Sequence, residues 1–169
     1  MDPNHYRFRD TWRLPAPPAA VYAALEDVRH YPLWWPEILA ARDTGAGAGG
    51  GSGDGSGYGS GDGGGGGSGE VVVRALLPYR LVIGLEAVRR DPVAGVLEVA
   101  MHGDLTGWSR WTVSADGTGS RALFEEDTRP GKPLLRRLAL PLHLVFRANH
   151  AVMMRRGRRG LAAYLTADN

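Results

Sequence analysis

Residues 105–128, LTGWSRWTVSADGTGSRALFEEDT, contain two stretches of alternating side chains joined by an Asp116-Gly117 turn. Alternation with a period of two is typical of a half-buried strand, and an Asp-Gly pair between two such stretches is typical of a hairpin. The inward face of the first strand is predicted to hold Leu105, Gly107, Ser109, Trp111 and Val113. The second strand is predicted to turn Ala122, Phe124 and Glu126 the same way. This stretch therefore predicts two antiparallel strands with one face toward a core.

The same pattern extends upstream. Residues 5–14, HYRFRDTWRL, alternate, and strand-like runs with short turns occupy residues 70–91 and 93–104. Consecutive strands joined by tight turns form an antiparallel meander rather than parallel βαβ units.

Two helical stretches complete the pattern. Residues 15–32 begin with prolines and carry an apolar stripe, and we expect Pro32 to end that helix. Residues 142–165 are amphipathic. The apolar face of this second helix is predicted to hold Leu142, Val145, Phe146, Asn149, Met153, Gly157, Gly160 and Tyr164. We expect an α+β fold with about seven antiparallel strands wrapped around the long C-terminal helix, leaving a space suited to a small molecule.

A glycine-rich tract occupies residues 45–69. It lacks large apolar side chains apart from Tyr58, so burial cannot offset the entropy of ordering it. The 44 residues before it are too few to bury a core of their own. We therefore expect one domain over residues 1–169, with a disordered loop insertion at 45–69.

The composition excludes several classes of site. The chain has no cysteine, which rules out disulfides and thiolate zinc sites. No apolar run reaches the eighteen residues typical of a membrane-spanning helix, and the N-terminus is too polar for a secretory signal. The spacing of His102, His143 and His150 is not typical of metal ligands. We expect a cytoplasmic protein with no metal, no cofactor, no nucleic-acid partner and no transmembrane segment. The oligomeric state is not predicted.

Four stretches carry a family resemblance: VYAALEDVRHYPLWWPEI (21–38), LPYRL (77–81), GDLTGWSRW (103–111) and FRANHAVMMRRGRRGL (146–161). With these, the chain resembles the START-like superfamily with the helix-grip fold, specifically bacterial polyketide cyclase/dehydrase-like (SRPBCC) proteins. The resemblance implies a cavity for a hydrophobic ligand. It does not fix the activity, because this fold hosts lipid carriers, hormone-binding proteins, ring cyclases and co-chaperones.

The predicted ligand-binding residues are mostly aromatic: Trp34, Trp35, Trp111, Phe124, Phe146, Asn149 and Met153. The two adjacent tryptophans either wall the mouth of a ligand site or plug the end of the core. Asn149 either bonds to strand backbone or donates to a ligand carbonyl. Gly107 either leaves room for a ligand or marks a bend in the sheet.

The candidate catalytic residues are Glu126, His150 and Tyr79. A carboxylate that faces an apolar cavity has its protonation disturbed by desolvation, which suits acid/base chemistry. Alternatively, Glu126 is solvated at the strand end or pairs with an arginine. An imidazole can accept or donate a proton, so His150 is either a general base or a satisfied residue at the edge of the helix face.

Two functions and one alternative follow. The first is binding of a hydrophobic or polyketide-like small molecule in the cavity. The second is cyclase/dehydrase catalysis, in which the cavity folds a poly-carbonyl chain and proximity supplies most of the rate. The alternative is an interaction module for anionic lipid or a protein partner, because no acidic residue lies between Asp127 and Asp168 and the helix surface there is rich in arginine.

Overall fold

The computed structural model describes residues 5–44, 67–74, 80–133 and 143–167. Its elements are β1 (Tyr6–Leu14), α1 (Pro18–Glu26), the 3-10 turn η1 (Val28–His30), α2 (Tyr31–Trp34), β2 (Ile38–Asp43), β3 (Ser68–Arg74), β4 (Arg80–Asp91), β5 (Val96–Gly103), β6 (Leu105–Asp116), β7 (Gly119–Pro130) and α4 (His143–Ala167).

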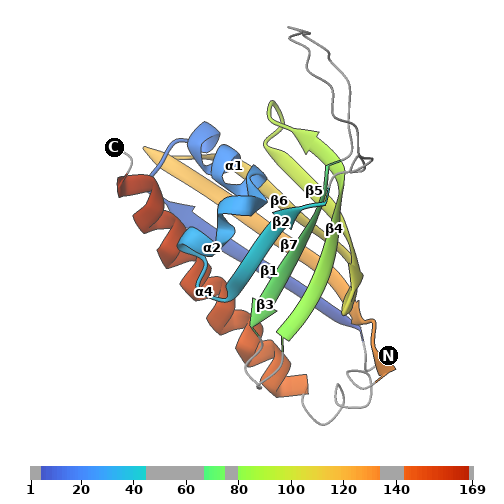
Figure 1. Ribbon diagram of the computed structural model, residues 1–169. Coiled ribbons are helices and arrows are strands. Elements are labelled where there is room, and N and C mark those ends of the chain that lie inside the picture. Colours follow the sequence, from blue (N-terminus) through green and yellow to red (C-terminus); the bar gives the residue numbers. More distant parts are fainter. Residues whose placement is uncertain (1–4, 45–66, 75–79, 134–142, 168–169) are drawn as a thin grey trace, which may run out of the picture.

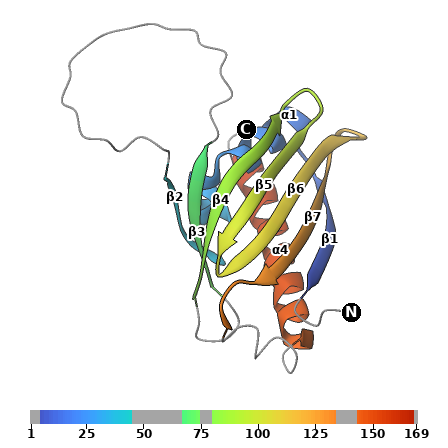
Figure 2. The same ribbon diagram turned by 90° about the vertical axis from the view of Figure 1, so that its right-hand side faces the viewer.

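The seven strands form one antiparallel sheet in the order β1-β7-β6-β5-β4-β3-β2. The N-terminal strand therefore lies beside the last one, although more than 100 residues separate Phe8 from its partner Glu126. The sheet curls, and α4 runs along its concave side (Figures 1 and 2). This arrangement confirms the predicted α+β helix-grip fold.

Prolines set the starts of the two short helices. Pro18 lies in the first turn of α1 and Pro32 in the first turn of α2, positions where a missing N–H removes no helical hydrogen bond. The expectation that Pro32 ends the first helix is wrong: α1 ends at Glu26, where the Asp27 N–H donates to the Ala23 carbonyl. A proline that ends one helix and one that begins the next look alike in sequence.

The glycine-rich insertion is shorter than predicted. Ser68 and Gly69 belong to β3, where Gly69 pairs with Asp43 of β2 and Leu85 of β4. Backbone pairing on both sides orders these residues without help from side chains. The edge strand β2 was not predicted. Residues 45–66 lie outside the described part of the chain, so their disorder and the single-domain assignment stay predictions.

Two glycines let helix α4 pack closely against Trp34 and Trp35. Met154 and Leu161 are fully buried, and Gly157 and Gly160 face α2. A Cβ on Gly157 would lie 2.6 Å from the Trp35 ring, and one on Gly160 would lie 1.7 Å from the Trp34 carbonyl oxygen. Because these glycines have no side chain, the turn that contains Trp34 and Trp35, here called the tryptophan turn, lies directly against the helix.

Candidate functional site

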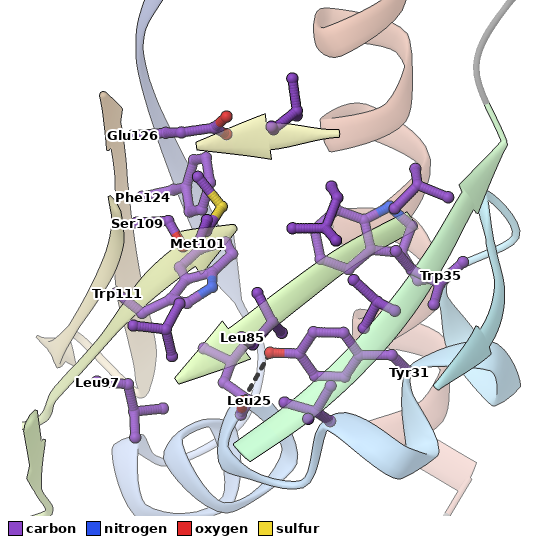
Figure 3. A pocket seen from close by; sticks show the side chains of 18 of the residues that line it. Leu25, Tyr31, Trp35, Leu85, Leu97, Met101, Ser109, Trp111, Phe124 and Glu126 are labelled. Carbon is purple, nitrogen blue, oxygen red and sulfur yellow. Dashed lines mark hydrogen bonds between the residues drawn. The ribbon is translucent and has the colours of Figure 1, made fainter. Parts of the chain in front are cut away.

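A cavity of about 690 Å³ lies between the concave face of the sheet and α4. In Figure 3, Glu126, Phe124 and Trp111 lie on one side of this space, with Trp35 and Tyr31 on the other. The volume is in the range of small-molecule sites. The fold therefore leaves a hollow rather than a filled core.

Six of the seven residues predicted to bind ligand line this cavity: Trp35, Trp111, Phe124, Phe146, Asn149 and Met153. Of the candidate catalytic residues, Glu126 and His150 also line it. Trp34 does not border the cavity, and Tyr79 lies outside the described residues. The structure thus brings eight of the ten predicted residues to one space, and their roles stay predictions.

Of the two adjacent tryptophans, one belongs to the core and the other lines the cavity. Trp34 is buried in the core against α4, so it plugs the structure rather than walls the cavity. Trp35 stacks beside it and lines the cavity, and its indole N–H donates to the Met153 carbonyl at 3.1 Å. This bond fixes the orientation of the Trp35 ring.

Gly107 does not make room for a ligand. Its φ is +147°, and a Cβ there would lie 2.0 Å from the Asp127 carbonyl oxygen of β7. The glycine is required by the close approach of two strands, which favours the bend alternative.

Glu126 and His150 face each other inside the cavity. The Glu126 Oε2 and the His150 Nε2 lie 3.4 Å apart, and the two side chains are 9% and 12% exposed. The pair is within ion-pair range, but the imidazole nitrogen is not aligned for a hydrogen bond. The His150 ring stacks on Phe8 with centroids 3.7 Å apart. Two groups able to exchange protons thus meet in a largely apolar space.

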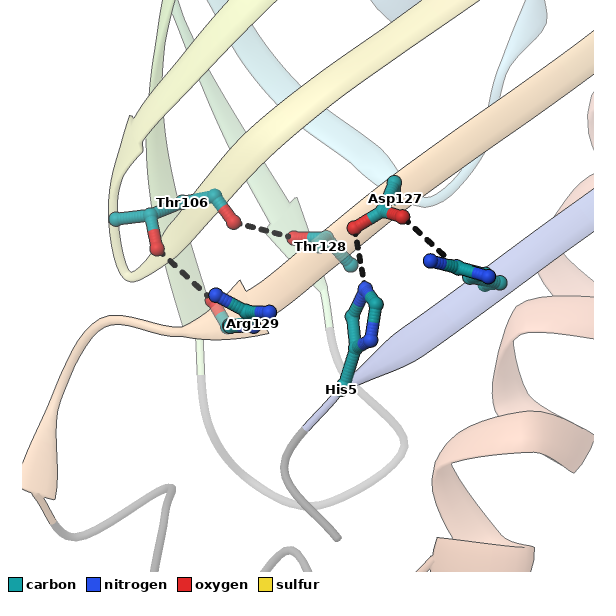
Figure 4. Close-up of polar contacts among 6 residues, drawn as sticks. His5, Thr106, Asp127, Thr128 and Arg129 are labelled. Carbon is teal, nitrogen blue, oxygen red and sulfur yellow. Dashed lines mark hydrogen bonds and ion pairs between the residues drawn. The ribbon is translucent and has the colours of Figure 1, made fainter. Parts of the chain in front are cut away.

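Contacts on both faces of β7 hold the backbone around Glu126. The neighbouring Asp127 carboxylate is hydrogen-bonded to His5, which directly precedes β1, and to Arg7 of β1. The Thr128 hydroxyl donates to the Thr106 carbonyl (Figure 4). The hydrogen bond from His5, and then that from Arg7, hold the pKa of the Asp127 carboxyl below its usual value. These contacts fix the position from which the Glu126 side chain enters the cavity.

Asn149 lies next to His150 at the cavity wall. Among the described residues, no hydrogen bond joins its side-chain amide to a strand. A half-buried amide that borders a cavity is suited to donate to a ligand carbonyl. The role of Asn149 toward a ligand stays a prediction.

Sequence reasoning missed much of the apolar wall, which comes from α1, α2 and three strands: Leu25, Tyr31, Val71, Leu85, Leu97 and Met101. Alternation in β3, β4 and β5 was the signal that could have found the strand residues. Tyr31 had no such signal. Its hydroxyl donates to the Leu25 carbonyl at 2.6 Å, and burial raises its pKa far above the ordinary tyrosine value.

The arginine-rich surface of α4 is only partly as predicted. Arg147, Arg155 and Arg159 are exposed, whereas Arg158 is half-buried. Arg156 is tied to the buried Glu37 carboxylate at 3.0 Å. A role of this surface toward anionic lipid or a protein partner stays a prediction.

Within the described ranges, no three His, Asp or Glu side chains gather in a way that could hold a metal ion. None of the described helices is both long and apolar enough to cross a bilayer.

Comparison with known families decides the assignment. Residues 5–166 match the profile of the family described as polyketide cyclase / dehydrase and lipid transport. The chain belongs to this family. Ligand binding in general is therefore supported. No curated protein matches the chain.

Solved structures agree on the fold. The Zhui aromatase/cyclase from Streptomyces sp. R1128 is similar with a TM-score of 0.70 and 12% identity, covering 96% of this chain and 94% of that one. A START superfamily protein from Mycobacterium smegmatis is similar with a TM-score of 0.67 and 13% identity, covering 96% and 99%. The protein TTHA0849 from Thermus thermophilus gives a TM-score of 0.64 and 16% identity, covering 94% and 99%. At these identities the similarity establishes the fold and not a shared activity.

Proposed function

We propose that this family member binds a hydrophobic or polyketide-like small molecule in the cavity between the sheet and α4. The observation that carries the proposal is a hollow of about 690 Å³ lined by many apolar and aromatic side chains, with polar groups such as Glu126, Asn149 and His150 among them. Such a combination is typical of small-molecule sites, where apolar contact supplies affinity and the polar groups fix orientation.

Native mass spectrometry of the purified protein tests the proposal directly. We expect a co-purified small molecule, released on denaturation. The matched variants are Leu85→Trp, which puts a large side chain into the cavity, and Val88→Trp on the same strand, where the residue is 60% exposed. Leu85→Trp should remove the bound molecule, and Val88→Trp should keep it.

Retention of the same ligand by a folded Leu85→Trp protein would place the ligand elsewhere and contradict the proposal. If no ligand co-purifies, the same pair of variants is compared for binding of an added apolar fluorophore. Equal binding by both variants would contradict the cavity as the site.

A second candidate function is acid/base catalysis of ring closure. The observation that favours it is the Glu126–His150 pair at 3.4 Å inside the cavity, beside Asn149. In this reaction one group removes a proton next to a substrate carbonyl, and the Asn149 amide donates to the developing oxyanion.

The probe for the second candidate is a synthetic linear poly-β-keto thioester, with ring formation followed by mass spectrometry. We expect Glu126→Gln and His150→Asn to slow cyclisation by about 10²–10⁴-fold while probe binding stays within a few-fold of the unmodified protein. Equal cyclisation rates with and without these side chains would leave binding as the function.

A further inference from the structure

A β-bulge in β4 turns one arginine toward the cavity. Ala87 pairs with Val99, but Arg89 pairs with the next residue, Glu98, so Val88 is the extra residue in β4. Beyond this point the alternation is reversed, and Arg90 shares the inward row of Leu97. Without the bulge, Arg90 would point to the outer face. Bulges commonly re-aim a side chain next to a functional site.

Arg90 borders the cavity at the end of β4 nearest α1. Its guanidinium lies over Gly67, because a Cβ on that glycine would meet the Arg90 Nη2 at 2.3 Å. This position is at the rim, where the side chain is exposed and reaches both solvent and the hollow.

Arg90 differs from the other arginines at this rim in having no acidic partner. No carboxylate within the described ranges lies in ion-pair range of its guanidinium, although three neighbouring arginines each have one. These neighbouring pairs are Arg29–Asp27, Arg42–Glu70 and Arg89–Asp91. A cation without a partner at the mouth of an apolar hollow is suited to an anionic group on a ligand.

We propose that Arg90 binds the carboxylate or phosphate of an amphipathic ligand whose apolar body fills the cavity. This proposal rests on the proposed function and narrows its ligand class. The apolar side chains along the walls contact the body of the ligand, and the Glu126–His150 pair meets its far end.

The separation of the two polar ends sets the length of the ligand. Arg90 lies in the same cross-strand row as Leu97, Trp111 and Phe124, and Glu126 is two residues beyond Phe124. Three strand spacings and two residues along a strand give about 16 Å over the sheet surface. The ligand is therefore an extended chain or a short row of fused rings with an anionic group at one end.

The test compares three probes with the same apolar chain: dodecanoate, dodecyl phosphate and uncharged methyl dodecanoate. Dissociation constants are measured by calorimetry for the unmodified protein, for Arg90→Met and for Arg121→Met. Arg121 is exposed and does not border the cavity, so it is the matched control for loss of one positive charge. Circular dichroism checks that each variant is folded.

We expect the unmodified protein and Arg121→Met to bind at least one anionic probe about tenfold more tightly than the ester. The carboxylate and phosphate probes distinguish the two sources of the anion. Arg90→Met should lower the affinity for that anion to the level of the ester and leave the affinity for the ester unchanged. Arg90→Lys should restore part of the preference.

An anion preference that survives in Arg90→Met, or equal binding of all three probes by the unmodified protein, would overturn the assignment of Arg90 while leaving the cavity as a ligand site. Failure of all three probes to bind would overturn both proposals.

Discussion

Replacing Gly160 with alanine tests the packing of α4 against the tryptophan turn. A Cβ at this position would lie 1.7 Å from the Trp34 carbonyl oxygen, whereas ordinary contacts begin at 3.4 Å. The two backbones must therefore separate by the difference, 3.4 − 1.7 = 1.7 Å. The clash is with backbone rather than with the end of a flexible side chain, so a rotamer change cannot relieve it.

Two opposing effects set the size of the change in stability. Alanine is favoured over glycine in a helix by about 1 kcal/mol. Overpacking costs about 1–3 kcal/mol, and a gap of this size also removes contacts made by the buried Met154 and Leu161. Taking the upper end of that range, we expect Gly160→Ala to lower the free energy of unfolding by about 2 kcal/mol.

The assay is urea unfolding followed by tryptophan fluorescence and by circular dichroism. The matched control is Ala163→Gly on the exposed side of the same helix, expected to cost about 1 kcal/mol from helix propensity alone. If Gly160→Ala instead raised the free energy of unfolding by about 1 kcal/mol, propensity would be acting unopposed. That result would contradict the close contact between α4 and α2.

Three further predictions concern the scaffold around the cavity. Asp104 is 2% exposed, contacts the Lys132 ammonium and accepts a hydrogen bond from the Val82 N–H. Asp104→Ala should therefore lower the free energy of unfolding by about 2 kcal/mol, measured by thermal or urea unfolding. A loss below about 0.5 kcal/mol would contradict this role. The pKa of Asp127 is lowered from 3.8 chiefly by the hydrogen bond from His5, so its stabilisation is present above pH 3.8 and is lost as the pH falls through its folded value. Asp127→Asn should then cost about 0.5–1 kcal/mol at pH 6, and this cost should shrink as the pH falls below 3.8. A difference independent of pH would refute the assignment. Tyr31→Phe should cost about 1 kcal/mol, measured by urea unfolding, because it leaves the Leu25 carbonyl without its donor; an unchanged midpoint would show that this bond contributes nothing.

The inward faces of three strands were readable from alternation. Trp12 and Leu14 in β1, Trp111 in β6 and Phe124 in β7 are all buried, because a period of two leaves no other way to separate apolar from polar side chains on a one-sided sheet. Glu126 followed from the same rule. His150 and Asn149 followed from helical spacing.

Tertiary contacts give different positions to residues that look equivalent in the sequence. Trp34 and Trp35 are adjacent and chemically identical, yet one is core and the other lines the cavity. Which one turns inward depends on where Gly157 and Gly160 of α4 meet them, a contact between segments more than 100 residues apart. No local rule contains that information.

By itself, the sequence determined the order of elements, the antiparallel sheet, the amphipathic final helix and the family, because these depend on periodicities and motifs along the chain. The tertiary structure alone decided that Glu126 and His150 meet, that the hollow stays open and that Arg90 points into it. The first two depend on how far the curled sheet stands from α4. The last depends on a single extra residue in β4, which reverses the faces of the residues that follow it.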